Sequence, residues 1–216
     1  MKFKQNKKLL IGSKKAISTL AKKDYARLLV ISDSHGNFER LFSIVKRYGK
    51  DCDALIFCGD GLGDLLTLLS IAEDESSVEK CIPPVIAFVR GNCDPEGMRL
   101  GGKNIEAPLE QTLKVNGHKI LIVHGHAHGI DFGMEKIALQ LKLGGYDTVF
   151  YGHTHIASQK ILNNTDDKKY RFINPGSCAR PRGGQVPGLA IATVAKDFID
   201  MSFINASNFE NWMPLA

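Results

Sequence analysis

Six of the seven histidines in the sequence lie in three short segments, and each segment follows an apolar run. These segments are residues 33–37 (DSHGN), 124–128 (HGHAH) and 152–155 (GHTH). Two further polar segments, residues 59–61 (GDG) and 91–94 (GNCD), also follow apolar runs. Every segment holds a glycine, which lets the backbone turn sharply and approach a ligand closely. Imidazole nitrogens and carboxylate or amide oxygens bind divalent metal ions in proteins, so the pattern predicts a metal site.

One metal-competent residue per segment recurs at nearly constant spacing. Asp33, Asp60, Asn92, His124 and His153 follow one another at intervals of 27 to 32 residues, which is the length of one strand and its crossover. Such units place successive strands in a parallel sheet, with these residues at the carboxyl ends, where α/β sheets bind ligands. The mixed oxygen and nitrogen set exceeds the needs of one tetrahedral ion. We therefore expect two ions that share a carboxylate, of the type Mn, Fe, Ni or Zn.

Short apolar runs and amphipathic stretches alternate along most of the chain. The apolar runs predict strands buried on both faces and lie at residues 26–32, 54–58, 85–89, 120–123 and 148–151. The amphipathic stretches predict helices at residues 38–48, 64–72 and 134–143. This alternation indicates an α/β domain with a parallel core.

The later part of the sequence has the pattern of antiparallel strands. Residues 111–115 and 119–123 flank Asn116-Gly117, a dipeptide typical of a two-residue hairpin turn. Further strands are expected at residues 157–162, 170–173, 188–194 and 198–203, with a turn at residues 163–169. No internal repeat or flexible linker divides the sequence, so residues 25–216 are expected to form a single domain.

Positive charge is concentrated at the start of the chain. The formal net charge is +5, but residues 1–24 hold eight lysines and one aspartate, which leaves −2 for residues 25–216. Residues 1–24 are therefore expected to form a basic N-terminal extension, either solvated or folded as a short amphipathic helix against the body. Binding of nucleic acid or anionic lipid by this extension is an alternative. The body lacks the broad basic surface that long nucleic acid favours, so nucleic acid is not the preferred partner.

The composition indicates the structural class of the protein and the cellular compartment in which it is expected. The 216 residues are 44% hydrophobic and 24% charged, as in an ordinary globular domain rather than a fibrous or disordered chain. Five cysteines without a C-x-x-C pair indicate neither a disulfide framework nor a zinc knuckle, and they fit a reducing compartment. No apolar stretch approaches the roughly 18 residues of a membrane span, and the longest apolar run near the N-terminus, residues 9–11, is shorter than the roughly 7 residues of a secretory leader. We predict a soluble, cytoplasmic protein.

In their order along the chain, the five polar segments resemble the motifs of the calcineurin-like metallophosphoesterase superfamily. The Gly-Asn-Cys-Asp form of residues 91–94 and the later Asn174-Pro175-Gly176-Ser177 resemble its small bacterial and archaeal phosphodiesterase branch. The resemblance covers residues 26–194. It implies two mixed β-sheets packed as a sandwich with flanking helices. It also implies a metal-dependent phosphoesterase, preferably a phosphodiesterase that hydrolyses a small phosphodiester or nucleotide-type substrate.

The resemblance further implies a role for each candidate residue. The first metal ion would be held by Asp33, His35 and His155, the second by Asn92, His124 and His153, and both by Asp60. Two divalent ions are expected, with Mn²⁺ as the first choice and Ni²⁺, Fe²⁺ or Zn²⁺ as alternatives. A hydroxide that bridges them would attack phosphorus. The expected catalytic residues are His126, Asp60 and Asn92.

One position departs from the family pattern. The residue after Asn92 is Cys93, whereas many family members have a histidine there that can protonate the leaving group. A thiol is a poorer proton donor for this purpose, so His126 is the expected replacement. A substrate with a good leaving group depends least on such an acid, which favours an aryl or similar phosphodiester.

Two alternatives of other kinds stay open on the sequence. A non-catalytic scaffold or protein-interaction module, like the retromer subunit of the same fold, is expected to have lost metal ligands, whereas all seven are present here. A nuclease or phosphomonoesterase is the other alternative.

Several residues are expected to support the site or to lie away from it. Asp94 is expected to orient Cys93 or a metal ligand. Asn174 and Ser177 are expected to hydrogen-bond Asp60 or a nearby loop, and Arg180 and Arg182 could reach a substrate phosphate. The histidines outside the metal set are expected at the surface or beside the ligands (His128) and in solvent on the hairpin (His118).

Overall fold

The computed structural model describes residues 3–163 and 169–209, and its larger sheet has six strands. The strand order is β1-β4-β3-β2-β12-β13, with bounds Ile11–Gly12 (β1), Val85–Phe88 (β4), Ala54–Phe57 (β3), Tyr25–Ile31 (β2), Gly188–Ala195 (β12) and Phe198–Asn205 (β13). Parallel pairing joins β2 to β3 and β3 to β4. β12 runs antiparallel to both β2 and β13, so the sheet is mixed.

The second sheet has five strands and is also mixed. Its order is β10-β11-β9-β8-β7, with bounds Ser158–Asn163 (β10), Lys169–Asn174 (β11), Thr148–Phe150 (β9), His118–Val123 (β8) and Glu110–Val115 (β7). β9 is parallel to β8 and to β11, while β7 and β10 form antiparallel edges. Asn116 and Gly117 join β7 to β8 with φ of 45° and 84°, as the hairpin prediction requires. Residues 164–168 of the predicted turn at 163–169 lie outside the described residues.

The two sheets pack face to face, and each central strand is buried on both sides. Leu28 and Val30 of β2 share one buried cluster with Ile120 and Ile122 of β8. The intervening residues of β2 point to the opposite face because side chains alternate along a strand. This two-sided burial explains the uninterrupted apolar sequence of the strands.

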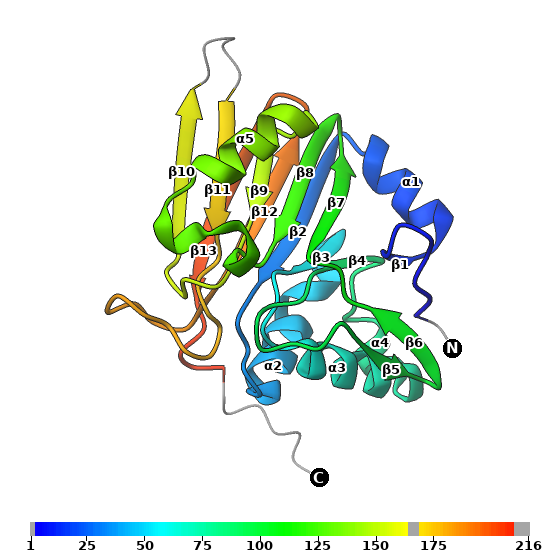
Figure 1. Cartoon of the computed structure of the whole chain (residues 1–216). Coiled ribbons are helices and arrows are strands. Elements are labelled where there is room, and N and C mark those ends of the chain that lie inside the picture. Colours follow the sequence, from blue (N-terminus) through cyan, green and yellow to red (C-terminus); the bar gives the residue numbers. More distant parts are fainter. Residues whose placement is uncertain (1–2, 164–168, 210–216) are drawn as a thin grey trace.

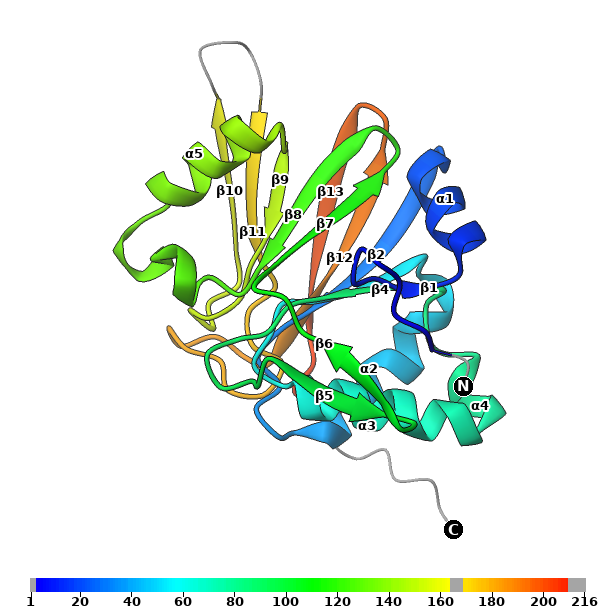
Figure 2. The ribbon, with the colours of Figure 1, turned by 45° about the vertical axis from the view of Figure 1, so that its right-hand side comes forward.

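Helices cover the outer faces of the sandwich (Figure 1). The two long ones over the six-stranded sheet are α2 (Phe38–Tyr48) and α3 (Leu62–Asp74), whose Leu41 and Leu65 pack in one cluster with Leu29 of β2. On the five-stranded sheet, α5 (Glu135–Gly144) buries Ile137 and Leu141 against Leu121 and Val149. Figure 2 shows α5 and α1 on opposite sides of the strands. The sandwich of two mixed sheets with flanking helices is confirmed.

Shorter elements complete the described chain. They are helix α4 (Ser76–Glu79), the hairpin strands β5 (Gly97–Leu100) and β6 (Lys103–Glu106), and three 3₁₀ turns, η1 (Gly49–Asp51), η2 (His126–His128) and η3 (Ile130–Phe132). Across the described ranges, no helix combines the length and the hydropathy needed to cross a membrane.

The regular spacing of the polar segments was a correct guide to strand ends but a wrong guide to the sheet. The five strands that precede these segments do not share one parallel sheet: β2, β3 and β4 lie in the larger sheet, and β8 and β9 lie in the smaller one. The spacing reports the length of a strand and its crossover. It carries no information on which sheet a strand joins, because pairing is non-local.

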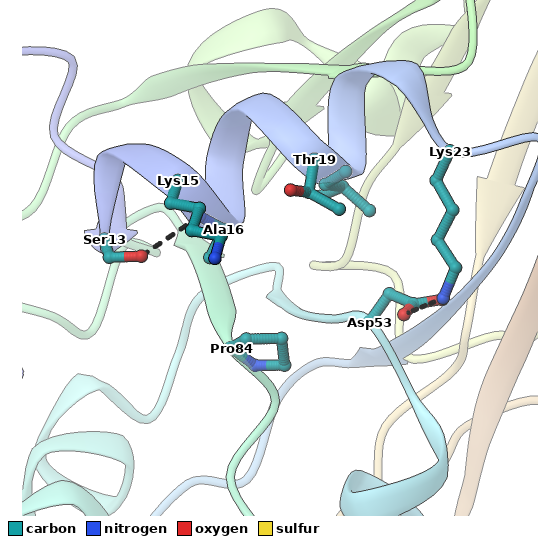
Figure 3. A pocket seen from close by; sticks show the side chains of 8 residues that line it. Ser13, Lys15, Ala16, Thr19, Lys23, Asp53 and Pro84 are labelled. Carbon is teal, nitrogen blue, oxygen red and sulfur yellow. Dashed lines mark hydrogen bonds and ion pairs between the residues drawn. The ribbon is translucent and has the colours of Figure 1, made fainter.

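Residues 3–24 pack on the body as a strand and a helix. β1 pairs with β4, and the predicted short amphipathic helix is present as α1 (Lys14–Lys22), with the Ser13 hydroxyl accepting a hydrogen bond from the backbone N–H of Ala16. Leu20 is buried with the residues between the sheets. Figure 3 shows α1 lying over Pro84 and Asp53, and Lys23 forms an ion pair with Asp53. The other helix lysines are exposed.

Candidate metal centre

The carboxyl ends of strands from both sheets meet at one place, and backbone hydrogen bonds connect the polar segments that follow them. Asp33 donates its backbone N–H to the carbonyl of Gly59 at 2.9 Å, and His35 donates to the carbonyl of Asp60 at 3.0 Å. Gly152 donates to the carbonyl of His124 at 3.0 Å, which ties β8 and β9 together where they end. Backbone hydrogen bonds alone therefore hold these segments next to one another.

Five of the seven predicted ligands bring their side chains together. His155 Nε2 lies 3.2 Å from Asp33 Oδ1 and 3.0 Å from His35 Nε2. Asp60 Oδ2 lies between two histidines, 3.6 Å from His35 Nε2 and 3.4 Å from His124 Nε2. The ligand atoms of Asp33, His35 and His155, and those of Asp33, Asp60 and His124, all lie within 4.8 Å of one another. The two groups therefore overlap at Asp33.

The atoms of this cluster fit a bound cation. Asp33 Oδ1 and His124 Nε2 are buried and make no hydrogen bond. A buried polar atom without a partner costs roughly 1–3 kcal/mol, a cost that a bound ion can offset. Carboxylate oxygens and imidazole nitrogens together suit borderline divalent metals. A divalent ion would satisfy both atoms at once.

Backbone carbonyls orient two of the ligand histidines. His124 Nδ1 lies 2.7 Å from the carbonyl oxygen of Cys58, and His155 Nδ1 lies 2.5 Å from that of Arg180. Because these carbonyls only accept, each Nδ1 must carry the proton, which leaves the lone pair of each neutral ring on Nε2. Both Nε2 atoms face the carboxylates of the cluster.

The electrostatics of the cluster favour positive charge. Burial acts to raise the pKa of Asp60, but the facing imidazole of His124 and the backbone N–H of Cys93 outweigh it and hold the pKa well below its usual range. Burial acts to lower the pKa of His124, but Asp60 and Asp33 reverse this and raise it. The pKa of His155 is raised chiefly by Asp33. The Asp60 carboxylate is therefore ionised and attracts cations.

The backbone of the cluster is strained. The predicted ligands with positive φ are Asp33 (57°), His35 (45°), Asp60 (55°), His153 (68°) and His155 (60°). In the described part of the chain only two other non-glycine residues, Leu9 and Asn116, have positive φ. This conformation costs roughly 1–2 kcal/mol per residue and tends to concentrate at functional sites. The strained ligand residues lie just after the ends of β2, β3 and β9.

Asp94 fastens the loop that carries Asp60. Its carboxylate accepts backbone N–H groups from Asp60 (2.7 Å), Gly61 (2.9 Å), Leu62 (2.8 Å) and Gly91 (2.9 Å). The prediction that Asp94 orients Cys93 or a ligand was too narrow, since the carboxylate organises two motifs at once. A following acidic residue in the Gly-Asn-Cys-Asp motif was the only signal for this in the sequence.

Two glycines are required by close approach. A Cβ on Gly91 would overlap the carboxylate of Asp60, and a Cβ on Gly59 would come within 2.9 Å of His124 Nδ1. Gly59 also has φ of 95°. The expectation that glycine lets the backbone approach the ligands holds at both positions.

Three predicted site residues lie beside the cluster rather than in it. His153 Nε2 is 2.9 Å from Asp131 Oδ2, and the His153 ring is 5.2 Å from the His124 ring. Asn92 is exposed, and its side-chain amide donates to Cys93 Sγ at 3.4 Å. The His126 ring is 5.4 Å from the His124 ring. The ligand roles of His153 and Asn92 and the acid role of His126 stay predictions.

Cys93, Asn174 at the end of β11 and Ser177 in the loop that follows lie beside the cluster. Cys93 Sγ lies within 4.8 Å of the ligand atoms of His35 and Asp60, and burial and Asp60 raise the pKa of the thiol. Ser177 donates its hydroxyl to the carbonyl of Asp33 at 2.7 Å. Asn174 donates to the carbonyl of Gly152 at 2.8 Å. Ser177 and Asn174 thus bond neighbouring loops, not Asp60, which was the other option that the sequence allowed.

The arginines approach the site differently. The Arg180 guanidinium donates to the carbonyl of His35 at 3.4 Å and lines a cavity beside it. For Arg182 the contact is through the backbone, whose N–H donates to the carbonyl of His155 at 3.0 Å. Of the two, Arg180 is the arginine whose side chain lies beside His35 and lines this cavity.

Comparison with known proteins agrees with the geometry. The model of the calcineurin-like phosphoesterase superfamily domain matches residues 27–197. The probable metallophosphoesterase YsnB of Bacillus subtilis is 32% identical over 185 residues, which cover 85% of this chain and 93% of YsnB. Phosphodiesterase MJ0936 of Methanocaldococcus jannaschii is 26% identical, with 77% of this chain and 92% of the relative covered.

A solved structure shares the fold. It is a conserved protein of Streptococcus pneumoniae TIGR4, described as a predicted phosphoesterase, with a TM-score of 0.62 and 23% identity, and the match covers 84% of this chain and 90% of that one. Together with the relatives, the fold and the cluster define a metal-dependent phosphoester hydrolase. The chain belongs to the calcineurin-like phosphoesterase superfamily, in its small bacterial and archaeal branch.

Proposed function

We propose that the protein is a phosphodiesterase that hydrolyses a small phosphodiester or nucleotide-type substrate at a centre of two divalent ions, with Mn²⁺ as the preferred metal. The proposed ligands are Asp33, His35 and His155 for one ion, Asn92, His124 and His153 for the other, and Asp60 for both. The observation that carries the proposal is the position of Asp60 Oδ2, within 3.6 Å of His35 Nε2 and 3.4 Å of His124 Nε2. A carboxylate between two histidines on different strands suits a shared ligand.

Residues of the protein itself hold the proposed ligands in position. Asp33 and Asp60 provide negative charge, the carbonyls of Cys58 and Arg180 set the histidine lone pairs, and Asp94 holds the Asp60 loop. When bound, two divalent ions polarise a phosphoryl oxygen and lower the pKa of water so that it can attack phosphorus. Because five of the seven proposed ligands already lie together, only Asn92 and His153 need to reorient when the ions bind.

The preference for a diester rests on the proton donor. Cys93 is a neutral thiol beside Asp60, where a histidine would be the better acid. His126 is the proposed donor to the leaving oxygen, since its ring packs against both His124 and His153 at centroid distances of 5.4 and 6.2 Å. A leaving group that needs little protonation suits this arrangement. The name of the relative MJ0936, a phosphodiesterase, supports the same choice.

A cavity beside the cluster supports a substrate with an organic substituent. It has a volume of about 570 Å³ and is lined by His35, Gly36, Asn37, Phe38, Glu39, Ala179 and Arg180. Phe38 offers an aromatic surface and Arg180 a forked donor for phosphate. In a phosphodiester, one ester group can occupy this cavity while the other leaves, whereas the single ester group of a monoester is itself the leaving group.

Hydrolysis of bis-(p-nitrophenyl) phosphate and p-nitrophenyl phosphate tests the proposal, with Mn²⁺, Ni²⁺ and Zn²⁺ added in turn to metal-free protein. We expect metal-dependent hydrolysis that is faster on the diester, fastest with Mn²⁺, and two ions per chain by mass spectrometry of the metal content. A faster monoester reaction contradicts the diesterase assignment. Cleavage of long DNA in preference to the small diester would support a nuclease instead, and no hydrolysis with any metal would support a scaffold.

A further inference from the structure

His153 is anchored differently from the proposed ligands His124 and His155. In His124 and His155, Nδ1 faces a backbone carbonyl and Nε2 faces the cluster. In His153, Nε2 lies 2.9 Å from the carboxylate of Asp131. Since a carboxylate only accepts, the proton of a neutral His153 ring lies on Nε2 and its lone pair lies on Nδ1.

The backbone and the ring of His153 both lie beside the cluster. The backbone N–H donates to Asp33 Oδ2 at 3.2 Å, and the φ of 68° belongs to the strained turn after β9. The ring packs edge-on against the His124 ring, with centroids 5.2 Å apart. Because Asp131 binds Nε2, Nδ1 is the ring nitrogen whose lone pair is left for a metal ion.

Asp131 is itself held in place by the loop that follows His124. The loop consists of the turns η2 and η3, with Gly129 (φ 67°) between them and Gly133 (φ 133°) after η3. Next to Asp131, Ile130 is only 7% exposed, packs in the cluster under α5, and donates its backbone N–H to the carbonyl of Gly125 at 3.3 Å. A buried anchor beside an exposed carboxylate keeps that carboxylate aimed at His153.

We propose that Asp131 is a positioning residue for the second metal ion: it fixes His153 in the tautomer with the proton on Nε2 and presents Nδ1 as the ligand. The inference rests on the proposed function, because it takes His153 as a metal ligand. A carboxylate on the far nitrogen of a metal-binding histidine also increases the basicity of the ligating nitrogen. The geometry thus assigns a metal-tuning role to a residue that touches neither ion nor substrate.

Titration of metal-free protein with Mn²⁺ in a calorimeter tests the inference. Removal of such a partner costs roughly 10–100-fold in metal affinity, so Asp131→Ala is expected to weaken one of the two binding events by that factor and to leave the other unchanged. Asp131→Asn keeps an acceptor oxygen and is expected to lose less. The matched control is Asp197→Asn, which removes an exposed carboxylate from the turn between β12 and β13 and should bind both ions as the wild type does.

A spectroscopic readout separates positioning from loss of structure. In ¹⁵N-histidine NMR spectra of metal-free protein, His153 should show its proton on Nε2 in the wild type and a mixture of tautomers in Asp131→Ala, with an unchanged unfolding midpoint. Wild-type affinity for both ions in Asp131→Ala, or an unchanged tautomer, overturns the inference.

His153→Ala distinguishes failure of the inference from failure of the proposed ligand set. This variant should lose the second ion. If it retains that ion, His153 is not a ligand and the proposed function is wrong at this residue. If it loses the ion while Asp131→Ala does not, only the role of Asp131 is wrong.

Discussion

A histidine lies at each end of strand β8, and both histidines face carboxylates. Only one of the two has a hydrogen-bond partner at both ring nitrogens. At the amino end, His118 Nδ1 lies 3.1 Å from Asp147 Oδ2 and Nε2 lies 2.9 Å from the carbonyl oxygen of Ala195. After the carboxyl end, His124 Nδ1 bonds a carbonyl in the same way, yet its Nε2 is buried without a hydrogen bond.

The same contrast holds for the two carboxylates. Asp147 accepts from Thr148 Oγ1 at 2.7 Å through one oxygen, and from His118 and the backbone N–H of Lys119 through the other. Asp33 Oδ1 has no hydrogen bond, although it is fully buried. We call a histidine–carboxylate pair saturated when each ring nitrogen and each carboxylate oxygen has a hydrogen-bond partner, and such a pair stabilises the fold. A pair with unpaired atoms and a strained backbone is arranged to bind a ligand. Residue types alone do not distinguish the two.

The largest effect that this comparison predicts is on activity, at the unsaturated end. Asp60→Asn should lower metal-dependent hydrolysis by more than about a hundredfold, because loss of a shared ligand should exceed the cost of losing a partner of one ligand. Initial rates on bis-(p-nitrophenyl) phosphate over a range of Mn²⁺ concentrations check this. His118→Gln is the control at the saturated end and should leave the rate unchanged. Comparable losses of activity in Asp60→Asn and His118→Gln would show that the two ends of β8 do not differ in function.

The next effect concerns the support of Asp60. Asp94→Ala leaves four backbone N–H groups without their acceptor, so the loops around Asp60 and Gly91 should loosen. We expect a loss of about 2–3 kcal/mol in the free energy of unfolding and a roughly 10–100-fold weaker affinity for metal. Urea unfolding and Mn²⁺ calorimetry measure the two effects. A variant that loses stability but binds metal normally would show that Asp94 serves the fold alone.

A smaller effect is expected at Cys93. Cys93→Ala removes a neutral thiol and should lower diester hydrolysis by less than about tenfold, since general acid catalysis by a good donor is worth about 10²–10⁴-fold and a thiol supplies little of it. Cys93→His should raise the ratio of monoester to diester rates by adding a better donor. Rates on the two p-nitrophenyl esters give the ratio. A loss in Cys93→Ala as large as that in Asp60→Asn would make the thiol an essential group.

Local sequence patterns predicted most of the strands and the long helices, but not β1, β5, β6 or α4. The helix predicted at residues 38–48 is α2 with the same bounds, because its amphipathic period and the Asn37 cap are both local. The polar segments follow β2, β3, β4, β8 and β9 because a buried strand must end where polar residues begin. The family resemblance then supplied the second sheet, which the regular spacing alone had missed.

Non-local contacts account for what the sequence did not predict. His118 was expected in solvent, but its side chain is only 11% exposed, since the carbonyl of Ala195, 77 residues away, closes over it. His128, expected at the surface or beside the ligands, pairs with Glu110 at 2.9 Å. Asp131 lies in a loop without any periodic pattern, so only coordinates could connect it with His153. The strain at the ligands likewise has no signature in residue type.

The smallest effect belongs to the saturated pair and appears as pH-dependent stability. Both partners of His118 are acceptors, so the doubly protonated ring fits its position, and the hydrogen bond to Asp147 raises the pKa of His118 despite the opposing effect of burial. A histidine whose folded pKa is raised contributes stability that is fully present below the unfolded pKa of about 6.5 and is lost as the pH rises through the folded pKa.

His118→Gln should therefore cost stability, on the order of 1 kcal/mol at pH 5.5, and clearly less at pH 9. Urea unfolding of both proteins at the two pH values measures the difference, in which the titration of all other groups largely cancels. In an Asp147→Asn background, which removes the charged partner, the pH-dependent part of the difference should disappear. An equal cost at both pH values would mean that His118 is held as a neutral ring, and the saturated end would then contribute packing but no ion pair.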